Sequence, residues 1–172
     1  MFGSSRRRSV ITTNDAIVKA MSATYARGRR RLRIRRASIT MRGVPLFVFA
    51  YGSLLFRPSR FFGERRAAVA HGWRRAFRQG SPDHRGTPAY PGRVVTLLRD
   101  EGASCGGALY VVEDAQVDDA LYELDDRESG GYDRAQITVH VRGEATPVDA
   151  VTWIAWPENH NHQPHAPVEH VA

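Results

Sequence analysis

The sequence predicts an α+β domain built on a mostly antiparallel or mixed sheet that can curl toward a barrel. Segments with a strand pattern outnumber the one clear amphipathic helix, and the connections between strands are too short for repeated βαβ units. The 172 residues are 42% apolar and 25% charged, which is the composition of a single globular domain. No apolar run approaches the roughly 18 residues that a membrane-spanning helix needs, so we expect no membrane partner.

The positive charge is concentrated in the first quarter of the chain. Residues 1–42 hold 11 Arg, one Lys and one Asp, so they carry a net charge of +11. Because the whole chain carries +7, the remainder carries 7 − 11 = −4 and is mildly acidic. Such a stretch is typical of a targeting presequence, of a basic arm for nucleic acid or anionic lipid, or of a disordered extension without a role. We favour the disordered extension over residues 1–42. Because this stretch has few aromatic residues interleaved with its Arg, we expect no nucleic-acid partner.

The first core strand is expected at residues 45–51, an almost unbroken apolar run of strand length. Gly52 and Ser53 then end the run at a turn. Gly allows a positive φ or a close approach to the backbone, and a buried strand that stops at such a turn leaves several N–H groups directed into one small volume. The turn is therefore a candidate site for an anion such as a carboxylate. The alternative is an ordinary turn at the end of a strand.

The middle of the chain predicts three strands and two connections. A strand is expected over residues 67–79, followed by a polar loop over residues 80–92, and loops of this length are often functional. Strands follow at residues 93–98 and 105–112. The acidic and Gly residues at 100–102 predict a turn between them.

The last third of the domain predicts a helix and two more strands. Asp114 is the expected N-cap of the helix, and the pair Gly130-Gly131 is the expected stop. The apolar face of this helix consists of Val117, Ala120, Leu121 and Leu124. Alternation predicts a half-buried strand over residues 136–142, and the final strand is expected over residues 148–156. These elements place the folded domain at residues 43–157.

Glu128 is the candidate acid/base residue. It lies just beyond the predicted helix and beside the Gly pair, where the chain can direct a side chain into a cavity. Burial raises the pKa of a carboxyl group toward neutrality, which makes the group an effective proton shuttle. The alternative is a solvated glutamate at a helix end, because Asp125 and Asp126 crowd the same region.

Other reactive groups are weaker candidates. Ser53, Asp83 and His84 lack the flanking Gly-x-Ser-x-Gly turn of a hydrolase. Cys105 is expected to be a buried, inert thiol, and as the only Cys it indicates a reducing compartment, for which we expect a cytoplasmic location. The His/Pro-rich residues 158–172 read as a solvated tail without ligand spacing. We therefore expect no metal site in this tail.

Several blocks in a fixed order resemble one family. They are Val48-Phe49-Ala50-Tyr51-Gly52-Ser53-Leu54, Gly72-Trp73-Arg74-Arg75, residues 79–88, residues 91–97 and Arg127-Glu128-Ser129-Gly130-Gly131-Tyr132. Together they resemble the ChaC-type, glutathione-specific γ-glutamylcyclotransferases. The resemblance implies a small mixed β-barrel with flanking helices. It also implies cleavage of glutathione to 5-oxoproline and cysteinylglycine. Because the nucleophile of that reaction is tethered to the carbonyl that it attacks, we expect no metal and no cofactor.

The resemblance also assigns roles to residues. The family's substrate-binding turn matches Val48, Phe49, Ala50, Tyr51, Gly52 and Ser53, and its catalytic glutamate matches Glu128. The chain stops at Ala172 without the family's last Gly-x-Asn-containing block, so we expect the C-terminal helical part to be missing. Two alternatives stay open at this point: a cyclotransferase for other γ-glutamyl peptides or amines, and a decayed enzyme that only binds.

Overall fold

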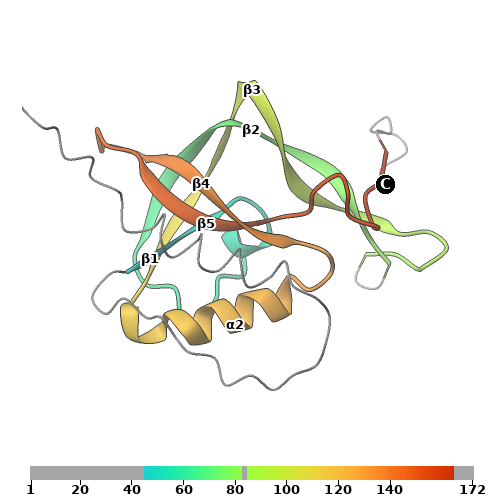
Figure 1. Ribbon diagram of the computed structural model, residues 1–172, viewed down its shortest axis with the longest axis horizontal. Helices are drawn as coiled ribbons and strands as arrows, with labels where there is room; N and C mark the ends of the chain where they lie inside the picture. Colours follow the sequence, from blue (N-terminus) through green and yellow to red (C-terminus); the bar gives the residue numbers. More distant parts are fainter. Residues whose placement is uncertain (1–44, 83–84, 165–172) are drawn as a thin grey trace, which may run out of the picture. The chain divides into compact units, whose positions relative to one another are not determined.

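The computed structural model describes residues 45–82 and 85–164. The α+β prediction is confirmed, because these residues form a closed five-stranded barrel with one α-helix beside it (Figure 1). The expectation of a disordered extension over residues 1–42 lies outside the described residues, as do Asp83, His84 and the end of the chain from residue 165.

The barrel is mixed, as the sequence indicates. The elements in chain order are β1 (Leu46–Ala50), η1 (Ser53–Leu55), β2 (Arg65–Ser81), β3 (Gly92–Val112), η2 (Asp114–Gln116), α2 (Val117–Arg127), β4 (Asp133–Val141) and β5 (Val148–Ile154). Around the barrel the strand order is β1-β3-β2-β4-β5. All neighbouring strands are antiparallel except β1 and β5, whose parallel pairing through Val48 and Val151 closes the barrel.

Alternating side chains fill the barrel interior. In β4, Ile137, Val139 and Val141 are buried while the residues between them face outward, which is the two-residue period of a strand. They join one core cluster with Phe49 of β1 and Leu97 of β3. Burial of this apolar surface is the main favourable term for the fold.

The turn expected at residues 100–102 is wrong, because β3 runs without a break from Gly92 to Val112. It pairs with β2 over residues 92–99 and again over residues 104–110, with a shift in register where His71 opposes Ser104 and Trp73 opposes Arg99. Gly72, at φ +77°, lies at this irregularity. The acidic and Gly residues that suggest a turn instead form the wide side of a bulge, and bulges bend a strand pair without ending it.

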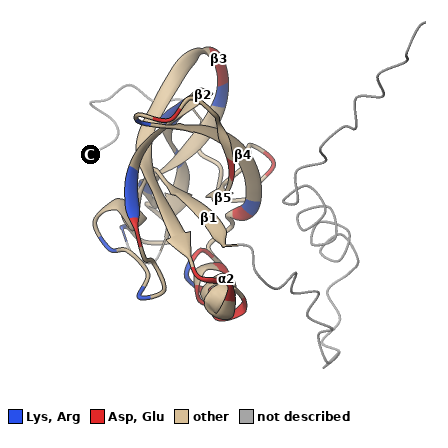
Figure 2. Cartoon of the chain, turned by 90° about the vertical axis from the view of Figure 1, so that its left-hand side faces the viewer, with Lys and Arg blue, Asp and Glu red and all other residues tan. Residues whose placement is uncertain are grey.

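The predicted helix is confirmed, but Asp114 is not its N-cap. Asp114 begins the short η2 turn, and Gln116 occupies the N-cap position of α2. The helix buries Ala120, Leu121 and Leu124 and lies beside the barrel (Figure 1). Figure 2 shows acidic residues along it, and its four Asp residues are exposed. Among the described residues, no helix is long and apolar enough to cross a membrane.

The C-terminal segment also differs from the expectation. Strand β5 ends at Ile154, and the backbone N–H of Ala155 instead donates to the Thr96 hydroxyl at 2.9 Å. The next residues, expected to be tail from residue 158, contact the barrel: Gly80 N–H donates to the Asn161 carbonyl and Gln163 N–H to the Arg78 carbonyl, both at 2.7 Å. Residues 158–164 are therefore attached to the end of β2.

Candidate active site

The Gly-Ser turn lies at the end of β1, as the apolar run predicts. Val48, Phe49 and Ala50 are buried in the barrel wall, at most 1% exposed. The chain then leaves the sheet at Gly52, which has φ −123° and so does not use the positive φ that glycine permits. A Cβ on Gly52 would lie 3.1 Å from Val95 Cγ1, so glycine serves here for close approach to β3.

Glu128 lies at the other side of this site, at the C-cap of α2. Its backbone N–H donates to the Leu124 carbonyl at 3.0 Å, so the last helical turn fixes its position. The side chain is only 17% exposed, which rules out the alternative of a solvated helix-end glutamate. Burial raises the pKa of the Glu128 carboxyl group, and the neighbouring Arg127 charge opposes part of that rise.

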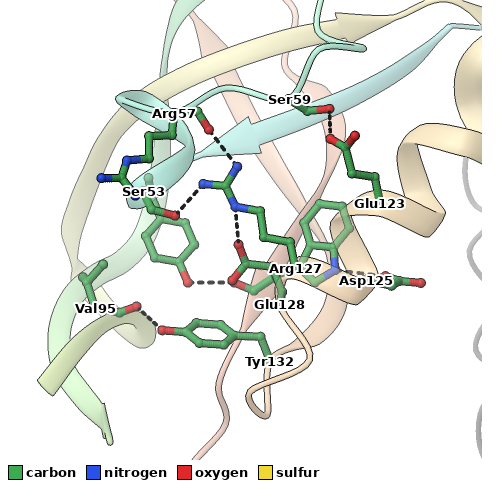
Figure 3. Close-up of polar contacts among 11 residues, drawn as sticks. Ser53, Arg57, Ser59, Val95, Glu123, Asp125, Arg127, Glu128 and Tyr132 are labelled. Carbon is green, nitrogen blue, oxygen red and sulfur yellow. Dashed lines mark hydrogen bonds and ion pairs between the residues drawn. The ribbon is translucent and has the colours of Figure 1, made fainter. Parts of the chain in front are cut away.

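Arg127 connects the two halves of the site (Figure 3). Its Nη1 donates to the Arg57 carbonyl at 2.8 Å and its Nη2 to the Ser53 hydroxyl at 3.2 Å. Its Nε lies 3.7 Å from Glu128 Oε1. One guanidinium therefore contacts both the turn after β1 and the carboxylate after α2. As the only basic residue in the last turn of α2, it also complements the helix dipole.

Two tyrosines complete the surroundings of Glu128. The Tyr51 hydroxyl donates to the Trp153 carbonyl and the Tyr132 hydroxyl to the Val95 carbonyl, each at 2.7 Å. Burial is the first cause that raises the pKa of each phenol, and the Glu128 charge adds to both. Both phenols therefore stay protonated at neutral pH and donate to these two backbone carbonyls.

The structure thus brings Tyr51, Gly52 and Ser53 together with Glu128, although they are far apart in the sequence. The side chains of Val48 and Phe49 lie in the core instead. Any direct contact of these two residues with a substrate therefore stays a prediction.

Sequence reasoning missed what Arg127 and Tyr132 do, although both lie in the block that contains Glu128. The available signal was their position: an Arg directly before the acid on the last helical turn, and a Tyr directly after a Gly pair that lets the chain fold back.

The remaining candidates lie elsewhere or outside the described residues. Cys105 is 1% exposed, and burial raises the pKa of its thiol, so it fits an inert core residue. A triad of Ser53, Asp83 and His84 is not testable, because the last two fall outside the described residues. Within residues 45–82 and 85–164, no three His, Cys, Asp or Glu side chains lie close enough to hold a metal ion.

The structure thus places a mostly buried carboxylate, paired with an arginine, near the turn that follows the first strand of a small closed barrel. A carboxyl group in such surroundings is able to transfer protons. The ChaC-like protein model matches residues 46–172, and the chain belongs to this family.

Curated relatives agree with this assignment. The human protein named glutathione-specific gamma-glutamylcyclotransferase 1 is 38% identical over 130 residues, which cover 74% of this chain and 59% of the relative. The Arabidopsis thaliana gamma-glutamylcyclotransferase 2-3 is 37% identical over 135 residues, which cover 74% and 67%. The chain thus spans about three fifths of the length of the human relative.

The fold has a solved counterpart. The crystal structure of a yeast gamma-glutamyl cyclotransferase specific to glutathione superposes with a TM-score of 0.69 at 22% identity, over 75% of this chain and 76% of the other. The barrel that the resemblance implies is therefore confirmed as the fold.

Proposed function

We propose that this protein cleaves glutathione by cyclisation of its γ-glutamyl group, releasing 5-oxoproline and cysteinylglycine. The observation that carries the proposal is the mostly buried Glu128 carboxylate, joined through Arg127 to the Ser53 hydroxyl of the turn after β1. The named activity of the relatives gives the substrate class.

The chemistry needs one proton shuttle and no external nucleophile. The α-amino nitrogen of the glutamyl group attacks its own γ-carbonyl carbon, forming the ring C–N bond, and the bond to the cysteinyl nitrogen breaks. In the process the ammonium gives up two protons, and the departing nitrogen gains two when it leaves as an ammonium. A carboxylate with a raised pKa accepts and returns protons near neutral pH, which is the role that we assign to Glu128.

The rest of the site holds the substrate in a conformation that can close. We assign the α-carboxylate to the Gly52-Ser53 turn, where the first N–H groups of the short η1 helix have no acceptor within that helix. The Arg127 charge beside Ser53 favours an anion at this place. Because the nucleophile is tethered to the carbonyl, fixing this folded conformer supplies much of the rate.

The direct test is to incubate the purified chain with glutathione and to measure 5-oxoproline and cysteinylglycine. We expect both products in equal amounts. A parallel reaction with γ-glutamyl-alanine measures specificity: faster turnover of that dipeptide would replace glutathione by another γ-glutamyl substrate. A folded chain that releases 5-oxoproline from neither compound would contradict the proposal and favour a protein that only binds.

Replacing Arg127 by Gln is expected to lower kcat/KM at neutral pH by at least about 10-fold, within the range that acid/base catalysis supplies. The Arg127 charge holds the pKa of the Glu128 carboxyl group below the value that burial alone would give. Its removal raises that pKa, so the acidic limb of the pH profile of kcat/KM moves to higher pH. Arg127→Lys, which retains the charge, is expected to move the limb less.

The matched control is Arg142→Gln, since Arg142 carries the same charge, is exposed, and follows the last residue of β4, whereas Glu128 precedes the first. It is expected to leave the profile unchanged. An unshifted acidic limb in the Arg127→Gln variant would show that the guanidinium does not control ionisation of Glu128.

A further inference from the structure

The turn that follows Glu128 is held by side-chain amides from two other parts of the chain. Gln79 Nε2 donates to the Gly130 carbonyl at 2.8 Å, and Asn161 Nδ2 donates to the same oxygen at 3.3 Å. Asn159 Nδ2 donates to the Gly131 carbonyl. We call Gln79, Asn159 and Asn161 the amide clamp. Its members come from β2 and from the segment after β5.

The orientation of the Asn159 amide is fixed by a second contact. Its Oδ1 accepts the backbone N–H of Asn161 at 2.8 Å, so the Nδ2 side faces the Gly131 carbonyl. Gly131 has φ +106°, and a Cβ at that position would overlap the Asn159 side chain. The glycine and the amide therefore fit one another, and the contact depends on an NH2 group at this place.

The segment that carries the two Asn residues is itself anchored on the barrel. Gly80 N–H donates to the Asn161 carbonyl, and Gln163 N–H to the Arg78 carbonyl. His162 pairs with Gln79 as an isolated bridge. Because β2 is part of the closed barrel, the clamp attaches the turn after Glu128 to the barrel.

The clamp adds to two backbone hydrogen bonds made by Glu128 itself. Its own N–H is held by the helix through the Leu124 carbonyl, and its carbonyl accepts the Tyr132 N–H at 3.2 Å. Between these two bonds lie Gly130 and Gly131, the residue type that loses the most conformational freedom on folding. A Gly-Gly turn next to a catalytic group needs external contacts to keep that group in one place.

We propose that Asn159, with Asn161 and Gln79, positions Glu128 for proton transfer, so that the segment expected to be tail is part of the catalytic apparatus. This inference rests on the proposed function. The three amides do not act on the substrate; they act through the Gly130-Gly131 turn. A displacement of about 1 Å at a reacting group lowers the rate by roughly 100-fold, so a loosened turn is expected to reduce kcat rather than substrate binding.

The test is Asn159→Asp, which retains the shape and the Oδ1 acceptor and replaces the NH2 donor by an oxygen that repels the Gly131 carbonyl. We expect kcat on glutathione to fall about 10- to 100-fold, while KM changes less than about 3-fold because the Gly52-Ser53 turn lies on another element. The control is His160→Asp, an exposed neighbour in the same turn that gains the same charge. It is expected to keep native kcat.

A readout that does not depend on activity separates the two proposals. Amide hydrogen exchange of the Tyr132 N–H is expected to accelerate in Asn159→Asp, while the N–H groups within α2 exchange at the native rate. If native protein releases no 5-oxoproline, the proposed function fails, and the exchange rates alone decide whether the clamp holds the turn. If native protein is active and Asn159→Asp retains native kcat and exchange, the clamp is wrong and the function stands.

Should Asn159→Asp fail to fold, Asn161→Ala provides the second variant. It removes only the 3.3 Å bond to the Gly130 carbonyl, so we expect a smaller fall in kcat, about 3-fold or more, with an unchanged thermal midpoint. Native kcat together with native exchange at Tyr132 in this folded variant would overturn the proposal.

Discussion

Replacing Glu128 by Gln is expected to reduce 5-oxoproline release from glutathione by at least about 100- to 10,000-fold, the contribution typical of a positioned acid/base group. The amide has nearly the same shape as the carboxyl group but cannot accept the proton of the α-ammonium. KM is expected to change little, because the turn at Gly52 and Ser53 is untouched. Steady-state kinetics with quantified 5-oxoproline gives both constants.

The same variant is expected to be at least as stable as the native protein at neutral pH. Burial raises the pKa of the folded-state Glu128 carboxyl group above its ordinary value. Its contribution to stability is therefore complete below the ordinary pKa of about 4.3 and is lost as the pH rises through the folded-state pKa. Gln carries no charge, so the variant does not lose stability as the pH rises. Its unfolding free energy should therefore exceed that of the native protein at neutral pH but not below about pH 4.

Asp126→Asn is the control for both measurements. It removes a carboxylate from the same end of α2, but Asp126 is exposed, and the Arg127 guanidinium contacts Arg57, Ser53 and Glu128 instead. Native activity is expected in this variant. A Glu128→Gln protein that turns over glutathione at the native rate would remove Glu128 from the mechanism.

The sequence predicts the parts of the fold that depend on local pattern. The apolar run before Gly52 is a buried strand, the apolar stripe from Ala120 to Leu124 lies on the inner side of a helix, and the alternation after residue 136 is a half-buried strand. In each case the side chains that need burial recur with the period of the element, so the local signal and the packed structure agree.

The errors arise where a tertiary contact decides the structure. Residues 100–102 have the composition of a turn. The strand nevertheless continues through them, because the residues of β3 before and after them pair with β2. Residues 158–164 are polar and rich in Asn and His, which reads as tail, but their amides meet backbone carbonyls of the turn at Gly130 and Gly131. The sequence around residues 158–164 does not indicate that their hydrogen-bond partners lie about 30 residues earlier in the chain.

In the candidate site, too, the local motifs could be predicted from the sequence and the tertiary contact could not. Glu128 and the turn at Ser53 are recognisable as separate motifs, and the family resemblance pairs them. That Arg127 joins them becomes visible only when α2 is packed against the barrel, because its guanidinium reaches the Ser53 hydroxyl and the Arg57 carbonyl from 70 or more residues away.

Phe49→Ala is expected to cost about 3–5 kcal/mol of unfolding free energy, the range for removing a buried aromatic ring. Phe49 is 1% exposed and lies in the central cluster, and its ring packs so closely on Gly107 of β3 that a Cβ there would overlap it. A loss of this size is a large part of the roughly 5–15 kcal/mol that holds a domain together. Urea unfolding monitored by tryptophan fluorescence measures it.

Phe56→Ala is the matched control, because it removes the same ring from a side chain that is 85% exposed. It is expected to change the unfolding free energy by no more than about 0.5 kcal/mol. Equal stability of the two Ala variants would show that Phe49 does not support the core.

Phe49→Leu decides whether Phe49 also contacts the substrate. Leu restores much of the lost volume and apolar surface, so the variant is expected to be folded, and its KM for glutathione should be native if Phe49 acts only by supporting the barrel wall beneath Tyr51 and Gly52. A raised KM in this folded variant would instead place the ring within reach of the γ-glutamyl group. The two outcomes separate a residue that holds the binding turn from one that forms part of it.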